Sequence, residues 1–244
     1  MQRLRRTMAA GLLALCAAIA SSSCVDNESS LFIYGVMEIN STQCLAKPDA
    51  SAVFIPEGTL DTAFADGYQA AILVGSHLTQ RGSRDKLRTE TSRLSITGAH
   101  MTLYGTNGSV TEFDTPATGL VNPSSGTDPG LAAVFARLIR DKDIPNLGGE
   151  GQMIARIKIL GTTLGGQDIE SGVFDFPITV CEGCLVTYPV EALDPENDYK
   201  CDAATDSGPD TTVCFFGQDV YFPCTYCSAF NDICANPGDN PYYN

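Results

Sequence analysis

The chain has 244 residues, of which 43% are hydrophobic, so it can build one large domain, or one domain with an appendage, around a substantial core. Its 29 acidic residues outnumber 15 basic ones, and the formal net charge is −14. A surface of this sign repels nucleic acid and anionic lipid headgroups, which excludes a nucleic-acid partner and a basic membrane-binding patch.

Residues 1–23 have the layout of a secretory signal peptide. Arg3, Arg5 and Arg6 precede an uninterrupted run of small and apolar residues at 8–20. As a helix this run would be about 20 Å long, which is shorter than the hydrocarbon core of a bilayer at about 30 Å. No later segment has the roughly 18 uncharged apolar residues of a spanning helix. We therefore predict an exported chain without a transmembrane helix.

Two cleavage sites compete at the end of this segment. Ala-Ile-Ala at 18–20 fits the small-x-small rule of ordinary signal peptidase. Ser-Ser-Ser-Cys at 21–24 resembles a bacterial lipoprotein box, in which the cysteine is acylated and becomes the first mature residue. The box departs from the usual pattern at Ser21, where a leucine is typical.

The number of cysteines favours acylation. The chain has ten cysteines, and Cys16 leaves with the signal peptide. Ordinary cleavage would leave nine, whereas a lipidated Cys24 leaves an even eight for pairing. We predict lipidation at Cys24, a lipidated tether at 24–30, and membrane attachment through acyl chains, which contribute about 0.8 kcal/mol per buried CH₂. The expected location is the bacterial cell envelope, anchored in the outer membrane on its periplasmic or surface face.

The middle of the chain is rich in strand patterns. Period-two alternation indicates half-buried strands, and turn-forming residues separate the segments. Gly98 shifts the phase between two of them, as at a bulge. The expected strands lie at 31–39, 68–74, 93–96, 100–104, 153–160 and 174–180.

Two of these segments show the alternation most clearly. In "MIARIKIL" and "FDFPITV" every second residue is apolar, which predicts one buried and one exposed face. Pro177 lacks an amide hydrogen, so we expect an edge or a bulge there. The glycines of the intervening "GTTLGGQD" fit a hairpin turn better than a phosphate loop, because no helix follows them.

The segment at 130–141, "GLAAVFARLIRD", is ambiguous. Its apolar residues fit helical spacing, yet Val134, Ala136 and Leu138 also alternate as in a strand. The surrounding strand pattern and the preceding "DPG" favour a strand. Because strands follow one another through short loops without alternating helices, we predict an all-β fold, an antiparallel immunoglobulin-like sandwich over 31–186.

Residues 187–244 differ in composition from the sandwich. They are acidic, poor in aliphatic side chains and rich in cysteine, so cross-links must replace a core there. We interpret them as a disulfide-rich appendage whose last residues, "NPGDNPYYN", form a solvated tail. A group of acidic residues could bind calcium, but it fits no EF-hand register, and a solvated linker is the preferred interpretation. That group is Asp194, Glu196, Asp198, Asp202, Asp206 and Asp210.

The two C-x-x-C pairs allow three interpretations. Cys181/Cys184 with Cys224/Cys227 has the spacing of a Cys₄ zinc site, but thiols pair in an oxidising envelope. A redox-active pair needs a helix N-terminus or positive charge nearby, whereas acidic Glu182 lies between Cys181 and Cys184. We therefore predict structural disulfides, with no metal and no cofactor.

We expect four disulfides whose connectivity the sequence leaves open. Cys44 is the one member in the N-terminal half, so it must reach the C-terminal set and tie the first strand region to the end of the sandwich. The eight cysteines are Cys44, Cys181, Cys184, Cys201, Cys214, Cys224, Cys227 and Cys234.

Two stretches carry a family resemblance. "GEGQMIARIKILGTTLGGQDIESGVFDFPITVCEGCLV" and "CFFGQDVYFPCTYC" resemble a group of uncharacterised envelope lipoproteins from myxobacteria and related predatory or social bacteria. The likeness is strongest over 150–234. It implies a strand-rich body, a surface or periplasmic location and lipid attachment, and it carries over no catalytic residues.

The chain contains few groups for catalysis. A Ser-His-Asp hydrolase needs a histidine as general base, and the chain has only His77 and His100; Ser76 adjoins His77, but neighbours in a strand point to opposite faces. No nucleophile elbow, H-E-x-x-H or Walker motif is present. We interpret both histidines as surface residues and predict no catalytic residues.

The expected protein is therefore non-enzymatic, with a structural or binding role and an envelope protein or a glycan as partner. Two alternatives stay open: a secreted carbohydrate-binding module or hydrolase accessory, and a thiol-disulfide exchange protein that uses the C-x-x-C pairs.

Overall fold

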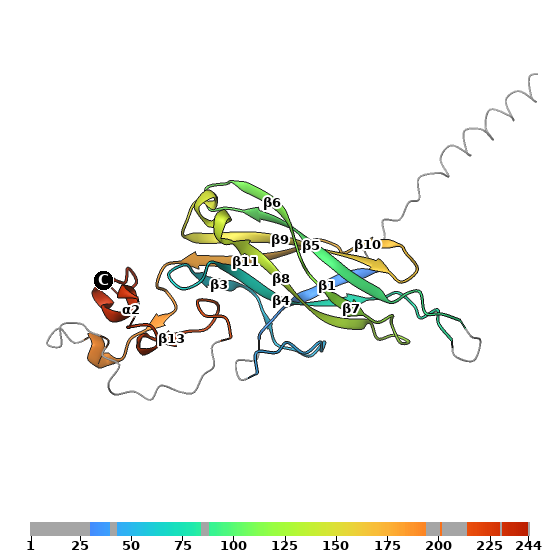
Figure 1. Ribbon diagram of the computed structural model, residues 1–244, viewed down its shortest axis with the longest axis horizontal. Helices are drawn as coiled ribbons and strands as arrows, with labels where there is room; N and C mark the ends of the chain where they lie inside the picture. The colour runs from blue at the N-terminus through green and yellow to red at the C-terminus, as the bar shows by residue number, and fades with distance from the viewer. Residues whose placement is uncertain are drawn as a thin grey trace, which may run out of the picture.

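The strands form two sheets that pack around one core, because alternate side chains of each strand point to the same side. The computed structural model describes residues 30–39, 43–83, 88–193, 201, 214–229 and 231–243. The chain is all-β over most of these residues, and the cysteine-rich appendage lies at one end of the two-sheet body (Figure 1).

The first sheet has four strands in the order β2-β1-β4-β8. Its neighbouring strands are all antiparallel. The strands are β1 (Leu31–Met37), β2 (Phe54–Ile55), β4 (Gly67–Ser76) and β8 (Gly130–Arg140).

The second sheet has the order β3-β11-β9-β5-β6, with β10 paired to β9 and β7 paired to β5. A 3₁₀ helix, η2 (Asp141–Leu147), joins β8 to this sheet. The strands are β3 (Gly58–Asp61), β5 (Leu94–Tyr104), β6 (Val110–Thr115), β7 (Gly119–Val121), β9 (Gly151–Thr163), β10 (Asp168–Glu170) and β11 (Phe174–Cys181).

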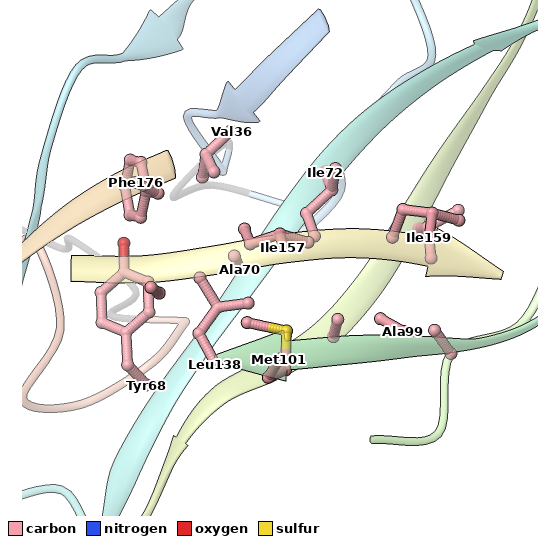
Figure 2. Packing of buried hydrophobic residues seen from close by; sticks show 14 of the residues in the cluster. Val36, Tyr68, Ala70, Ile72, Ala99, Met101, Leu138, Ile157, Ile159 and Phe176 are labelled. Atoms are coloured by element: carbon pink, nitrogen blue, oxygen red, sulfur yellow. The ribbon is translucent and has the colours of Figure 1, made fainter. Parts of the chain in front are cut away.

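The core lies between the two sheets (Figure 2). Ile157 and Ile159 of β9 and Met101 of β5 meet Ile72 of β4 and Leu138 of β8, and all five are buried. This is the alternation expected for "MIARIKIL": residues 153, 155, 157 and 159 point inward, while Arg156 and Lys158 point out.

The ambiguous segment is strand β8, paired with β4 from Gly130 to Arg140, so the strand prediction is confirmed. Val134 and Leu138 face the core, and Leu131 and Phe135 pack on the opposite face. Because both faces of β8 are apolar, its sequence satisfies helical as well as strand spacing. Its partner strand decides between them.

The outer faces of the two sheets differ in polarity. On the second sheet, cross-strand ion pairs such as Arg156–Asp175 and Lys158–Glu170 face outward. On the first sheet, Met37, Ala71 and Leu73 are buried beneath side chains of the β1–β2 connection and β8. The second sheet is therefore amphipathic, whereas the first is apolar on both faces.

The strand pairing departs from a purely antiparallel pattern. β3 runs parallel to β11, with Ile178 opposite Gly58. About 120 residues separate the two strands in sequence, so no hairpin dictates their direction. At Pro177, one residue before this pairing begins, β11 is paired with β9 alone among the described strands, as expected for a residue without an amide hydrogen.

Two local predictions concern glycines. The strands expected at 93–96 and 100–104 are one strand, β5, whose register shifts between Ile96 and Gly98, so the bulge is confirmed and the break is not. "GTTLGGQD" closes the antiparallel β9–β10 hairpin, with Gly166 at a φ of 83°. Glycine suits that left-handed conformation because it has no Cβ.

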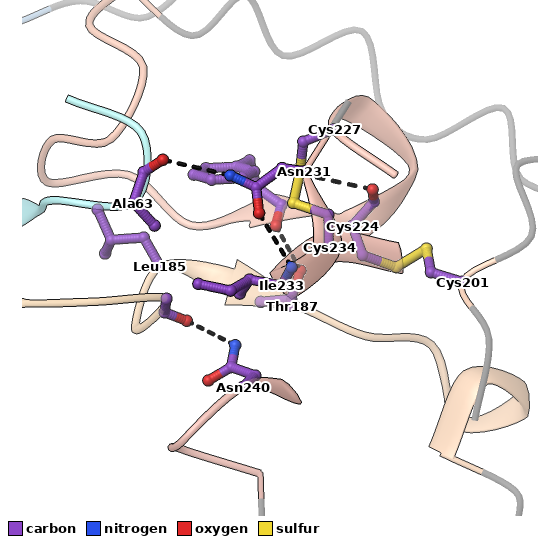
Figure 3. The surroundings of a disulfide bond; sticks show 12 residues. Ala63, Leu185, Thr187, Cys201, Cys224, Cys227, Asn231, Ile233, Cys234 and Asn240 are labelled. Atoms are coloured by element: carbon purple, nitrogen blue, oxygen red, sulfur yellow. Dashed lines mark hydrogen bonds between the residues drawn. A yellow bond between two sulfur atoms is a disulfide. The ribbon is translucent and has the colours of Figure 1, made fainter. Parts of the chain in front are cut away.

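The appendage has its own small core. β12 (Val186–Thr187) pairs in parallel with β13 (Phe222–Pro223), followed by η5 (Cys224–Tyr226), α2 (Asp232–Ala235) and η6 (Pro237–Asp239). Figure 3 shows the disulfides around α2 and the Asn231 amide, which donates to the Ala63 carbonyl of the body. Leu185 and Val186 are buried in the same small core.

The prediction of a solvated tail is wrong for Asn240, the central residue of "NPGDNPYYN". Asn240 is fully buried, and its amide donates to the Gly183 carbonyl (Figure 3). The same amide also donates to the Tyr188 hydroxyl. The Tyr243 hydroxyl donates to the Val186 carbonyl. Burial of Asn240 is tolerated because its polar atoms are hydrogen-bonded within the protein.

Strand β9 offers a matched test of the core. We expect Ile157→Ala to lower the free energy of unfolding by about 2–5 kcal/mol, because it leaves a cavity between the sheets. Ile154→Ala lies on the outer face of the same strand, where the residue is 41% exposed, and should cost much less. Urea unfolding of both variants checks this; equal losses would contradict the placement of the core.

Candidate functional site

The eight cysteines predicted to be cross-linked lie in four pairs. Cys181 pairs with Cys184 and Cys44 with Cys214. In the appendage, Cys201 pairs with Cys224 and Cys227 with Cys234. Their Cα–Cα distances of 5.3 to 6.1 Å lie in the usual disulfide range. The two C-x-x-C pairs are therefore not assembled into one Cys₄ cluster.

The long-range bridge differs from the expected one in its endpoint. Cys44 does reach the C-terminal set, but it bonds Cys214, 170 residues away, and not a cysteine at the end of the body. Cys44 follows β1, and Cys214 begins the segment that leads to β13. The bridge therefore holds the appendage against the first sheet.

Asp61 organises the loop that contains Cys181 and Cys184. Its carboxylate is fully buried and accepts hydrogen bonds from the amides of Gly183 at 2.7 Å and Leu185 at 2.9 Å. A third bond comes from the Ala63 amide at 3.1 Å. Burial nevertheless raises the pKa of this carboxyl, and the backbone amides oppose that shift.

The Asp61 carboxylate and the two sulfur atoms lie within 4.8 Å of one another. A carboxylate at this distance disfavours a thiolate on Cys181 or Cys184. Cys181 is also buried, which further disfavours the charged form. This arrangement suits a fixed loop better than an attacking thiol.

A pocket of about 240 Å³ lies where the body meets the appendage. We call it the junction pocket. It is lined by Val36, Met37, Glu38 and Ile39 at the end of β1, Ile55 of β2, Tyr68, Gln69, Ala70 and Ala71 of β4, and Cys214, Phe215, Gln218, Asp219 and Val220 of the appendage.

Asp219 links the two sheets at this pocket. Its carboxylate accepts a hydrogen bond from the Tyr68 hydroxyl of β4 at 2.8 Å and another from the Thr59 amide of β3 at 2.7 Å. Asp219 is an exposed residue with a φ of 57°, and its carboxylate is hydrogen-bonded to the hydroxyl of the fully buried Tyr68. Partial desolvation of the carboxyl beside Tyr68 raises its pKa, against the effect of both hydrogen bonds.

Gln218 fastens the same segment to β4. Its side-chain oxygen accepts from the Gln69 amide and its nitrogen donates to the Gln69 carbonyl, both at 3.2 Å. Backbone bonds from Asp61 to Gly217 and from Asp219 to Thr59 attach the segment to β3. The appendage thus contacts the end of both sheets.

The Asp219 carboxyl should leave a signature in the pH dependence of stability. A folded-state pKa above the unfolded value stabilises the fold at low pH, and this contribution is lost as pH rises through the folded pKa. As the pH rises from about 4, the free energy of unfolding of the wild type should therefore fall relative to that of the Asp219→Asn variant. Asparagine tolerates the left-handed backbone. Urea titrations at several pH values check this, and a wild type that gains relative stability with pH would contradict it.

The two histidines lie apart from the pocket lining. His77 is exposed and stacks on Phe32, with ring centroids 4.7 Å apart. His100 is on the outer face of β5, where its Nδ1 lies 2.7 Å from the Asp114 carboxylate. Ser76, next to His77, is buried and its hydroxyl accepts from the Leu78 amide.

Several predicted features lie outside the described residues. These are the signal peptide at 1–23, Cys24 with the tether up to residue 29, and the six acidic residues between 194 and 210. Among the residues that the structure does describe, no helix has the length and apolar character needed to cross a bilayer. Family models, curated proteins and solved structures all give no match to this chain.

Sequence reasoning missed Asp61, Asp219 and the junction pocket. Apart from Ala63, the partners of these carboxylates are more than 100 residues away in sequence: Gly183 and Leu185 in the loop after β11 for Asp61, and Thr59 of β3 and Tyr68 of β4 for Asp219. Of these features, the sequence analysis included only Asp219, as part of the "GQD" stretch of the family resemblance.

Proposed function

We propose that this protein is a non-enzymatic, lipid-anchored protein of the bacterial cell envelope, similar to the myxobacterial envelope lipoproteins, with a structural or binding role. The observation that carries the proposal is the pairing of all eight cysteines from Cys44 to Cys234. Four disulfides persist in an oxidising compartment, which an exported chain reaches.

The expected anchor is the acylated Cys24. With Cys24 lipidated, the disulfides use every remaining cysteine after the signal peptide, and no thiol is left to cross-link. The acidic surface of the chain is repelled by anionic lipid headgroups. Attachment to a membrane would therefore have to come from acyl chains. Attachment in the outer membrane is part of this proposal.

As part of this proposal, the two-sheet body is an antiparallel immunoglobulin-like sandwich. Two sheets around a shared core support it, and the parallel β3–β11 pair is a departure from that pattern. Such folds host many unrelated functions, so the fold itself does not select a ligand.

A binding role is favoured over a purely structural one by the junction pocket. Concave, mostly apolar sites with a few convergent polar groups are typical ligand sites. The surface positions of His77 and His100 support a non-enzymatic protein. Binding to an envelope glycan is the alternative that this observation also favours; retention of the intact protein on cell-wall material would identify it.

Intact mass spectrometry of protein extracted from the envelope tests the proposal. We expect a mass that corresponds to a chain starting at Cys24, carrying acyl groups, and lacking one hydrogen for each paired cysteine. Unprocessed protein in the cytosol with reduced thiols would overturn it. Stoichiometric zinc on the same form would instead support a metal site.

A further inference from the structure

The walls of the junction pocket are mainly apolar. Val36, Ile55 and Val220 supply aliphatic side chains, and Phe215 supplies an aromatic ring. At about 240 Å³ the pocket can hold a group the size of a substituted phenyl ring. The walls therefore suit a compact apolar body.

The charged groups at the pocket are of one sign. Among the described residues of its lining, Glu38 and Asp219 are the ionisable carboxyl groups, and none is a lysine or an arginine. The net charge of the chain, −14, adds to this potential. An anionic ligand would meet repulsion here, and a cationic one attraction.

Asp219 has hydrogen-bond partners but no cation. Within the described part of the chain, its carboxylate contacts the neutral Tyr68 hydroxyl and the Thr59 amide, and no basic side chain pairs with it. A carboxylate can accept about four hydrogen bonds, so acceptor capacity remains. A ligand cation beside this carboxylate would form a charge-assisted hydrogen bond, which is stronger than a neutral one.

We propose that the junction pocket binds a small organic cation, an ammonium group on a compact apolar body. The ammonium group lies toward Asp219 and Glu38, and the apolar body packs against Val36, Ile55 and Phe215. This inference rests on the binding role proposed above and names its ligand class.

Isothermal titration calorimetry on the oxidised full-length mature protein tests it, with three probes of similar shape. The probes are 2-phenylethylammonium, neutral 2-phenylethanol and anionic 3-phenylpropionate. We expect the ammonium probe to bind most tightly and the carboxylate probe to show no binding. Equal binding of the alcohol and the ammonium probe, or no binding of any probe, would overturn the proposal.

Three variants locate the interaction. Asp219→Asn keeps an acceptor for Tyr68 and should weaken ammonium binding by about tenfold or more, because hydrogen bonds to charged groups are the strong ones. Glu38→Gln should weaken it less. Glu112→Gln on β6, an acidic residue outside the pocket lining, is the control and should bind as the wild type does.

Both variants must first be shown to melt cooperatively. If Asp219→Asn and Glu38→Gln then both bind the ammonium probe as tightly as the wild type does, the ligand assignment is wrong. That outcome is distinct from failure of the proposed function, because acylation and disulfide formation are read from the intact mass and do not depend on any probe.

Discussion

Removal of the Cys44–Cys214 bridge by the double substitution Cys44→Ser/Cys214→Ser should lower the free energy of unfolding by about 5 kcal/mol. The bridge spans 170 residues, and in the chain-entropy model a long closed loop restricts the unfolded chain most. Cys44 is exposed and Cys214 half-buried, so serine is tolerated at both positions. The measurement is urea unfolding of the oxidised protein.

The Cys181–Cys184 pair provides the comparison. Its two cysteines are three residues apart, so in the same model removal of this bridge lowers the free energy of unfolding by only about 2 kcal/mol. The slope of the unfolding free energy against urea should also rise in the Cys44/Cys214 variant, because its unfolded chain exposes more surface. An unchanged slope together with a loss below about 1 kcal/mol would contradict the expectation.

The second large effect is expected at Asp61. Asp61→Ala removes the acceptor of three backbone amides, and each buried donor left without a partner costs about 1–3 kcal/mol. A total loss of about 3 kcal/mol or more should follow. Asp61→Asn keeps one acceptor oxygen and should lose less.

Two further observations separate this role from a general effect of removing an acid. Amide hydrogen exchange at Gly183 and Leu185 should become faster in Asp61→Ala, because both amides lose their acceptor. Asp49 is an exposed aspartate that accepts from the Ser51 amide, and Asp49→Ala should leave the stability nearly unchanged. Protected amides at both positions in Asp61→Ala would show that the carboxylate does not hold the loop.

If Asp61 fixes the loop, the C-x-x-C pair keeps its shape largely without the disulfide. Reduction of Cys181–Cys184 should then leave the Gly183 and Leu185 bonds in place. The same carboxylate keeps the sulfur atoms in a site that disfavours thiolate. A thiol-disulfide exchange role therefore has less support here than a structural one.

Strand prediction succeeded where one face of a strand is solvated. In β9, polar side chains alternate with buried ones, and the pattern has only one interpretation. In β8 both faces are apolar, so periodicity alone was ambiguous. Pairing with β4 along its whole length resolved it.

Composition misled at the C-terminal tail. "NPGDNPYYN" is polar and short of aliphatic residues, which is typical of solvated segments. Asn240 is nevertheless buried, because its amide finds the Gly183 carbonyl and the Tyr188 hydroxyl. These partners lie more than 50 residues away, so no local pattern could reveal them.

The sequence by itself determined the all-β class, the alternating strands, the Gly98 bulge, the β9–β10 hairpin and the set of cysteines available for pairing, because each depends on short-range periodicity, backbone freedom or simple counting. Only the tertiary structure decided which cysteines pair, that β3 runs parallel to β11, and that Asp61 and Asp219 bind backbone amides of distant segments. These features depend on which strands meet across a sheet edge. That is set by the packing of the whole core and not by any one segment.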